Sequence, residues 1–288
     1  MAVLMFYLQT RATRGTTVCE KNYCDAFPSV DQVETKDFHD APPLPTPTKQ
    51  SPTMSTDSLS LIRKELMHYV EPAYKAGAIL FFKEKINPLG VRTPIVRKIA
   101  RMYFPKEATK QEVFALCEQL LQKKTYEETL IAFDWAVKQT HEFEKNDFAR
   151  LERWLKTYVN NWAFCDDFCT HAFGALITRY PELLSKTKKW RVSENRWLRR
   201  ASAIILIHPM MKKKKEFLKD VFEAADALLV DDDDLVQKGY GWMLKIASNS
   251  YPADVFQFVM KRKNTMPRTA LRYAIEKYPK EMKKSAMK

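Results

Sequence analysis

The sequence predicts an all-α protein arranged as an α-solenoid of stacked helical hairpins. Three observations support this prediction: glycine is scarce, apolar residues recur at helical spacing from Ser58 onward, and prolines mark the breaks between the periodic segments. The chain of 288 residues has only 6 glycines. That is too few for the turns of a β-sandwich or barrel, or for the phosphate loops of a glycine-rich nucleotide-binding fold. Its 45% hydrophobic residues are typical of a globular protein.

The first 57 residues differ in composition from the rest of the chain. They hold 6 of the 15 prolines, five of them between Pro42 and Pro52, which is typical of an extended, solvated tail. We therefore expect residues 1–57 to be a disordered N-terminal extension. Two alternatives stay open. In the first alternative, the opening segment is an organelle-targeting peptide, because it has arginines but no acidic residue before Glu20. In the second, the natural start of the chain is Met54.

From Ser58 to the C-terminus, apolar residues follow the i, i+3, i+4, i+7 spacing of amphipathic helices. Breaks that contain proline separate these segments, because proline is tolerated where helices start or stop. Repeated helix pairs of this length favour a solenoid, and an irregular helical bundle is the alternative. We therefore expect residues 58–288 to form one helical domain. The clearest periodic segments are 60–70, 94–104, 109–122, 126–139 and 146–159.

The predicted domain is strongly basic. Residues 1–57 hold 5 Lys/Arg and 7 Asp/Glu, and the remaining 43 Lys/Arg and 28 Asp/Glu give residues 58–288 a net charge of +15. This surplus indicates a polyanionic partner such as nucleic acid or an acidic membrane surface, with a merely soluble basic domain as the alternative. No apolar run reaches the ~20 residues that span a bilayer.

Cysteine usage indicates the compartment. The 5 cysteines are sparse and odd in number, which argues against a disulfide framework and for a reducing environment. We expect an intracellular protein, cytoplasmic or nuclear, unless the N-terminal segment directs it to an organelle.

The segment 159–180 holds the first candidate site residues. Asn161 can cap a helix, and Trp162 and Asp166 then lie one turn apart on the same face. A large ring beside a carboxylate suits a site for a cationic, planar group. The structural alternative for Trp162 is core packing. Asp167 points elsewhere, and we expect it to be a solvated charge.

Two later segments add arginines and glycines. Arg199 and Arg200 lie just inside an otherwise apolar helix. Because a buried guanidinium needs a partner, Arg200 is expected to contact a phosphate or to hold a carboxylate, and Arg199 to lie at the surface. Gly239 and Gly241 stand beside Trp242 in a helical pattern. Each glycine costs about 1 kcal/mol relative to alanine, so close approach of a helix or a ligand must explain it.

The spacing of three candidates fits a repeat. Asp166 precedes Arg200 by 34 residues, and Arg200 precedes Trp242 by 42, close to the repeat length of helical-hairpin solenoids. Residues one repeat apart lie on equivalent helices. We therefore expect the three side chains to line one concave face.

The cysteines and histidine around residue 169 do not predict a metal site. Cys165, Cys169 and His171 lack a second ligand pair with the spacing of zinc sites, and cysteines pack well inside helices. The sequence also lacks the common nucleotide-binding and zinc-protease motifs. We expect no metal and no cofactor.

Five motifs, in order along the chain, resemble the DNA alkylation repair family of AlkD-like HEAT-repeat DNA glycosylases. The resemblance extends from about Ser58 to the C-terminus. Just before the motif that begins at Gly90, the family often has a tyrosine. This sequence has Phe81 and Phe82 there, which lack a hydroxyl. The motifs are Gly90-Val-Arg-Thr-Pro94, Trp162-x-x-x-Asp166, Trp197-Leu-Arg-Arg200-Ala, Val236-Gln-Lys-Gly-x-Gly-Trp242-x-Leu-Lys and Pro267-Arg-Thr-Ala-Leu-Arg-Tyr-Ala274.

The resemblance implies a HEAT-like solenoid that excises cationic N3- or N7-alkylated purines from duplex DNA, in base excision repair. It implies that Asp166 is the catalytic carboxylate and that Trp162 and Trp242 are the aromatic walls of a lesion cleft. It also implies that Arg200 contacts the DNA backbone beside the lesion. We expect a monomer whose partner is duplex DNA and not a membrane.

Other cations of the domain fit phosphate contacts. For the lysine run after Met211, a solvated loop is the alternative. The main alternative function is a non-catalytic helical-repeat scaffold that binds nucleic acid or protein. The combination of a carboxylate, two tryptophans and an arginine favours the enzyme, because a scaffold does not need that carboxylate. The cations are Lys212, Lys213, Arg268 and Arg272.

Overall fold

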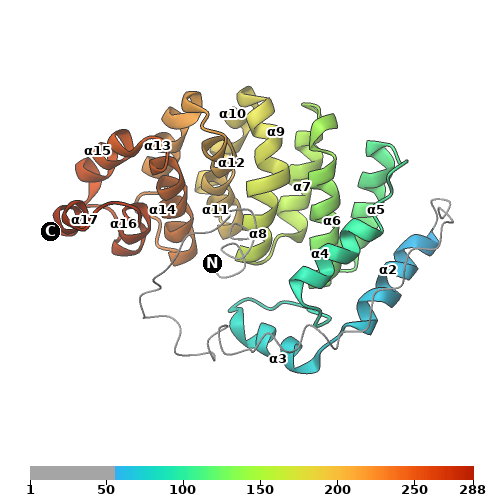
Figure 1. Ribbon diagram of the computed structural model, residues 1–288. Coiled ribbons are helices and arrows are strands. Elements are labelled where there is room, and N and C mark those ends of the chain that lie inside the picture. Colours follow the sequence, from blue (N-terminus) through green and yellow to red (C-terminus); the bar gives the residue numbers. More distant parts are fainter. Residues whose placement is uncertain (1–55) are drawn as a thin grey trace. The chain divides into compact units, whose positions relative to one another are not determined.

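The computed structural model describes residues 56–288, and every regular element in this part of the chain is a helix (Figure 1). The all-α class predicted from the sequence is confirmed. The disordered extension predicted for residues 1–57 lies outside the described residues, apart from the first two residues of a helix that begins at Thr56. Across residues 56–288, the structure has no helix of the length and hydrophobicity that a membrane crossing requires.

The helices follow one another with short connections, several of which are single turns of 3-10 helix. The short elements are the 3-10 helices η3 Thr140–Glu142, η5 Pro181–Leu183, η6 Lys188–Val192 and η7 Lys215–Phe217, and the π-helical turn η4 Cys169–Phe173. The α-helices are α2 Thr56–His68, α3 Pro72–Phe81, α4 Thr93–Met102, α5 Lys110–Gln122, α6 Tyr126–Lys138, α7 Asp147–Tyr158, α8 Trp162–Phe168, α9 Gly174–Arg179, α10 Leu184–Thr187, α11 Arg196–Ile204, α12 Ile207–Met211, α13 Leu218–Ala227, α14 Asp234–Ser248, α15 Pro252–Arg262, α16 Arg268–Ala274 and α17 Lys280–Met287.

The helices pack in sequence order, as in a solenoid. Helices α4, α6, α8, α11, α14 and α16 each pack against the next and form what we call the first row (Figure 1). Helices that lie between them in the sequence pack against this row, such as α5 on α6 and both α13 and α15 on α14. The predicted α-solenoid is therefore confirmed. Side chains on successive first-row helices can meet although they are far apart in the sequence.

The three first-row helices that carry the candidate residues begin at side-chain caps. The side-chain oxygens of Asn161, Asn195 and Asp233 accept hydrogen bonds from first-turn backbone N–H groups of α8, α11 and α14, at 3.0, 2.9 and 2.9 Å. Such a cap stabilises a helix by about 1 kcal/mol. The caps fix the first turns of α8, α11 and α14, which carry Asp166, Arg200 and Trp242, respectively.

The tryptophans divide into two groups. Four of the 6 are buried in the hydrophobic core, where apolar rings are normally found. Trp162 and Trp242 are only half-buried, and these are the two for which the sequence predicts a role in the lesion cleft. The buried four are Trp135, Trp154, Trp190 and Trp197.

One buried carboxylate holds the connection between α3 and α4. Glu127, in the first turn of α6, accepts hydrogen bonds from the backbone N–H groups of Leu89, Gly90 and Val91 at 2.8, 2.8 and 3.0 Å. Gly90 has a φ of 108°, in the region that favours glycine. A Cβ at this position would lie 2.8 Å from the Cβ of Lys75 in α3. The glycine of the first motif therefore lets the loop pack closely against α3.

Candidate functional site

Asp166 and Arg200 form a buried ion pair between α8 and α11. Nε of Arg200 donates to Oδ1 of Asp166, and Nη2 donates to Oδ2, both at 2.8 Å. The side chain of Asp166 is 10% exposed and that of Arg200 is 6% exposed. Of the two roles expected for Arg200, the structure contains the second, in which it holds a carboxylate. Two parallel charge-assisted hydrogen bonds fix the orientation of the carboxylate group.

Helix α14 supports the other side of Arg200. Nη1 of Arg200 donates to the carbonyl oxygen of Leu235, and a Cβ on Gly239 would lie 3.2 Å from both Cγ and Nη1 of Arg200. Burial is the largest single effect and lowers the pKa of the guanidinium, but the opposing effects, led by the carboxylate of Asp166, together outweigh it. The pKa is therefore raised, and the group stays charged. At Gly241, a Cβ would lie 2.7 Å from a backbone oxygen of α16. Both glycines thus have the packing role that the sequence predicted.

Trp162 belongs to an aromatic cluster at the end of α3. Its ring stacks on that of Phe82, with centroids 5.4 Å apart and planes at 18°, and the ring of Phe81 meets it edge-on at 6.0 Å. Trp162 also packs against the core, so core packing and a partly open position both apply. One turn along α8 from this cluster lies Asp166.

Trp242 lies on α14, three residues after the glycine that contacts Arg200. Its ring is half-buried at the edge of the core. First-row helices α8, α11 and α14 therefore carry Trp162, Asp166, Arg200 and Trp242, as the 34- and 42-residue spacings predicted. Ring contacts join Trp162 to the end of α3, whereas Trp242 packs at the edge of the core.

The other candidate cations lie at the surface. Lys212 and Lys213 are exposed in the segment that follows α12, and Arg268 and Arg272 are exposed on α16. All four are presented to solvent, which is compatible with phosphate contacts, whereas the side chain of Arg200 is buried. The backbone carbonyl of Lys213 accepts a hydrogen bond from the hydroxyl of Tyr251 at 2.6 Å, which fixes this turn.

Asp167, next to the paired carboxylate, belongs to a separate network. Its Oδ1 accepts a hydrogen bond from Nη2 of Arg97 at 2.7 Å, and Arg97 also pairs with Asp134. Nδ1 of His171 lies 3.5 Å from the same oxygen of Asp167. The side chain of Asp167 is 15% exposed, so the expectation of a solvated charge is wrong. Burial raises the pKa of Asp134 to about 6, although Arg97 opposes the shift.

Arg199 also departs from the expectation that it lies at the surface. Its Nε donates to Oδ2 of Asp231 at 2.7 Å, and its side chain is 17% exposed. Arg199 therefore connects α11 to the segment before α14. Neither Asp231 nor Asp134 lies in a recognised motif, and their arginine partners are more than 30 positions away. No local sequence pattern therefore predicts these pairs.

A third contact that the sequence did not predict joins the segment after α3 to the first row. Nη1 of Arg196 lies 3.6 Å from Oε1 of Glu84, and its Nε lies 2.9 Å from Oδ2 of Asp233. Arg196 is the first residue of α11, and Asp233 caps α14. The segment after α3 is therefore linked to α8 through aromatic rings and to α11 through Arg196. Arg196 in turn binds the cap of α14.

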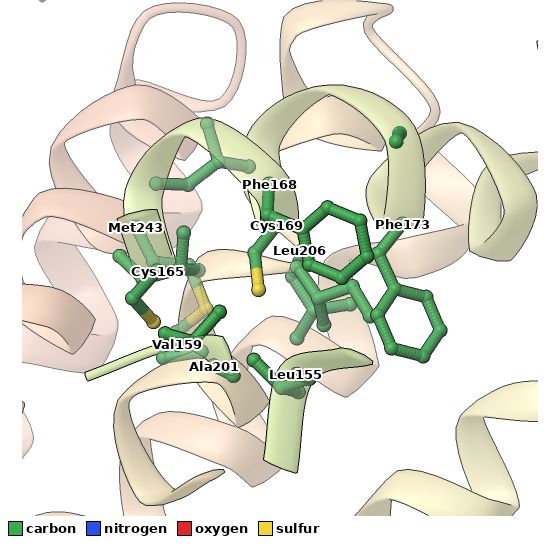
Figure 2. Close-up of a cluster of buried hydrophobic side chains, with 14 of the residues drawn as sticks. Leu155, Val159, Cys165, Phe168, Cys169, Phe173, Ala201, Leu206 and Met243 are labelled. Atoms are coloured by element: carbon green, nitrogen blue, oxygen red, sulfur yellow. The ribbon is translucent and has the colours of Figure 1, made fainter. Parts of the chain in front are cut away.

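The two cysteines of α8 and η4 face the core. Figure 2 shows Cys165 and Cys169 among buried hydrophobic side chains that include Phe168, Phe173 and Met243. Burial raises the pKa of the Cys169 thiol well above its usual value, and the neighbouring Cys165 adds to the shift. Within residues 56–288, no group of three or more His, Cys, Asp or Glu side chains is placed to hold a metal ion.

Comparisons with known proteins point to a single family. The family model described as "DNA alkylation repair enzyme" matches residues 62–278. A solved structure described as a predicted DNA alkylation repair enzyme from Enterococcus faecalis is similar in fold, with a TM-score of 0.64 and 20% identity, over 73% of this chain and 97% of that chain. No match was found among the curated proteins.

Proposed function

This chain belongs to the DNA alkylation repair enzyme family and so has a role in DNA repair, and we propose that it is a DNA glycosylase. Its substrates would be cationic N3- or N7-alkylated purines in duplex DNA, and the reaction hydrolyses the N-glycosidic bond. The observation that carries this proposal is the buried carboxylate of Asp166, which Arg200 holds in one orientation one turn from the half-buried Trp162.

The chemistry of a cationic purine suits a single carboxylate. When the N-glycosidic bond breaks, its electron pair goes to the base, which leaves as a neutral molecule while positive charge develops on the sugar. A fixed carboxylate beside C1′ stabilises this oxocarbenium-like state. Water then attacks C1′, and Asp166 orients it and accepts its proton. The positive charge of the base replaces a general acid, so the proposed reaction needs no metal and no cofactor.

The aromatic residues and Arg200 have separate roles in this proposal. Trp162 and Trp242 offer ring faces to the cationic nucleotide, and a cation–π contact contributes about 0.5–2 kcal/mol. Arg200 has five N–H donors, and Asp166 and Leu235 accept from three of them. In this proposal the other N–H groups donate to a phosphate oxygen beside the lesion, which requires DNA to reach a side chain that is 6% exposed. DNA binding and the orientation of the carboxylate would then be coupled through one side chain.

Exposed cations would supply the remaining backbone contacts. Lys212, Lys213, Arg268 and Arg272 would bind phosphates without regard to sequence, and each contact would make binding more sensitive to salt. We propose that the protein acts as a monomer. A sedimentation measurement of the protein alone and on a short duplex tests that state.

The direct test is release of 7-methylguanine and 3-methyladenine from alkylated duplex DNA. We expect release of both cationic bases above background and no release of normal bases from undamaged DNA of the same sequence. The alternative, a non-catalytic scaffold, predicts salt-sensitive DNA binding that is indifferent to the charge of the lesion. DNA binding without any base release would contradict the glycosylase and favour the scaffold.

A further inference from the structure

The C-terminal part of the domain has a surface hollow where the start of α15 faces the segment that leads into α17. Its volume is about 640 Å³, within the range of roughly 300–1,000 Å³ in which ligand sites usually fall. None of the described residues that line it is acidic. The hollow therefore has room for large apolar side chains of another molecule. Its apolar walls are Pro252, Ala253, Phe256, Tyr278, Pro279 and Met282.

Contacts within the protein fix the walls of this hollow. The hydroxyl of Tyr278 donates a hydrogen bond to the carbonyl oxygen of Pro252, the first residue of α15, at 2.8 Å. The rings of Tyr278 and Phe256 pack together with centroids 5.2 Å apart. Phe256 and Met282 also pack against the core while staying partly exposed. A site whose walls are already in place loses little entropy when it binds a partner.

Positive charge surrounds the hollow. From Pro252 to the C-terminus the chain has 10 Lys/Arg and 3 Asp/Glu, a net charge of +7, which is nearly half of the +15 carried by residues 58–288. Among the described residues, only one of these ten cations, Arg262, pairs with a carboxylate, that of Asp226. The described surface therefore keeps a surplus of positive charge. Lys277 lines the hollow itself, and the exposed lysines of α17 are Lys280 and Lys284.

An occupant that fits this surface is both apolar and anionic. A DNA duplex has the charge, but its base faces are stacked inside and cannot fill an apolar hollow. An acidic peptide has both features, because one large side chain fills the hollow while flanking carboxylates meet the lysines. Charge complementarity and the apolar lining together therefore favour a peptide.

The hollow is separate from the candidate functional site. Ser248, at the end of α14, lines the hollow, whereas Gly239 on the same helix packs against Arg200. The nine residues between these two positions correspond to about 14 Å along the helix. A peptide in the hollow therefore leaves Asp166 and Arg200 accessible to DNA.

We propose that this hollow is a docking site for an acidic peptide segment of a partner protein. A large aromatic or aliphatic side chain of the peptide packs against Phe256 and Met282, and acidic residues beside it pair with Lys277 and the lysines of α17. Methionine is flexible and adapts to different apolar side chains. The docking site goes beyond the proposed function and is independent of it, because it uses none of the residues assigned to base release.

The test selects random peptides displayed on phage against the immobilised full chain and, in parallel, against Ala253→Trp, which fills the hollow. On the wild type, we expect enrichment of peptides that combine Asp or Glu with a large apolar residue. The most enriched peptide is then titrated by fluorescence anisotropy. Ala253→Trp should weaken its binding at least about tenfold, and Lys277→Glu about fivefold.

Lys106→Glu is the matched control, because it makes the same charge change at an exposed lysine between α4 and α5. It should leave peptide binding within about twofold of the wild type. Circular dichroism checks that each variant folds, and the comparison of the two lysine variants decides the proposal if Ala253→Trp does not.

Three results would overturn the docking site. The first is no enrichment of acidic, apolar peptides on the wild type, or equal enrichment on folded Ala253→Trp. The second is equal weakening by Lys277→Glu and Lys106→Glu, which would leave only net charge as the cause. The third is a short duplex that displaces the peptide and binds more weakly to Lys277→Glu than to Lys106→Glu, which would assign the surface to DNA. Peptide binding without base release contradicts the glycosylase alone.

Discussion

Asp166 and Asp167 are neighbours on α8, yet they belong to ion networks of different kinds. Asp166 has a single cationic partner, Arg200, which meets it through two parallel hydrogen bonds. Asp167 shares Arg97 with Asp134, so two carboxylates meet one guanidinium. The first pair lies one turn from a half-buried tryptophan. The second network ties α4, α6 and α8 together.

The difference between the two networks is the basis for proposing Asp166, and not Asp167, as the catalytic carboxylate. Arg97 is shared by two acids, so loss of either acid leaves the arginine paired. Among the described residues, Arg200 binds one acid and one backbone carbonyl, and a glycine on α14 lets it pack closely against that helix. We infer that the Asp167 network holds the helices in register and that the Asp166 pair is the part that responds to DNA. The following experiments separate these roles.

The largest effect on stability is expected from Arg200→Leu. This change leaves the Asp166 carboxylate buried and unpaired, which should lower the free energy of unfolding by about 3–5 kcal/mol. The double variant Asp166→Asn with Arg200→Leu removes both charges and should recover more than half of that loss. Urea unfolding of the wild type, both single variants and the double variant measures the coupling. Additive losses would show that the two side chains do not depend on each other.

A smaller effect is expected from Arg97→Met. It should cost about 2–3 kcal/mol at neutral pH, because Asp134 and Asp167 then repel without a cation between them. The loss should shrink as the pH falls. Arg97 opposes the rise of the Asp134 pKa, which is about 6 in the wild type. Its removal therefore raises this folded-state pKa further, so protonation stabilises the variant more than the wild type as the pH falls from neutral toward 4. A loss that is constant across this range would contradict the network.

The smallest effect is expected from His208, outside both networks. Burial, and to a lesser degree Lys212, lowers its pKa to about 4, and its Nδ1 lies 2.7 Å from Oγ1 of Thr178. The unfolded state therefore binds a proton first, and stability should fall by about 2 kcal/mol as the pH falls from 6.5 toward 4. His208→Gln should remove this pH dependence of the free energy of unfolding, measured by urea unfolding at several pH values. An unchanged pH dependence would exclude His208 as its source.

Local sequence predicts much of this architecture. Periodicity and the scarcity of glycine predict an all-helical solenoid, and Asn161 is predicted to cap α8, which it does. Gly239 and Gly241 are predicted to admit close neighbours, and both do. These features depend on residues close together in the chain, where helix geometry fixes which side chains share a face.

Long-range pairing is where sequence reasoning stops. Asp167 is 70 positions from Arg97 and was expected to be solvated. The sequence predicts either a phosphate or a carboxylate as the partner of Arg200, because nothing in its own helix identifies which helix lies opposite. The stacking of Phe82 on Trp162 likewise depends on a loop anchored by Glu127. An ion pair or aromatic pair between two helices leaves no periodic signal in either helix. It can therefore be identified only from the way the helices pack in three dimensions.

The most direct test of the difference between the two carboxylates is the single-turnover rate of 7-methylguanine release by Asp166→Asn and Asp167→Asn, measured beside the wild type with saturating enzyme. Both variants make the same chemical change at adjacent positions, and circular dichroism checks that both fold. We predict that Asp166→Asn lowers the rate about 10²–10³-fold, whereas Asp167→Asn stays within about threefold of the wild type. Equal rates for the two variants, or a wild-type rate for Asp166→Asn, would contradict the assignment of Asp166 as the catalytic carboxylate.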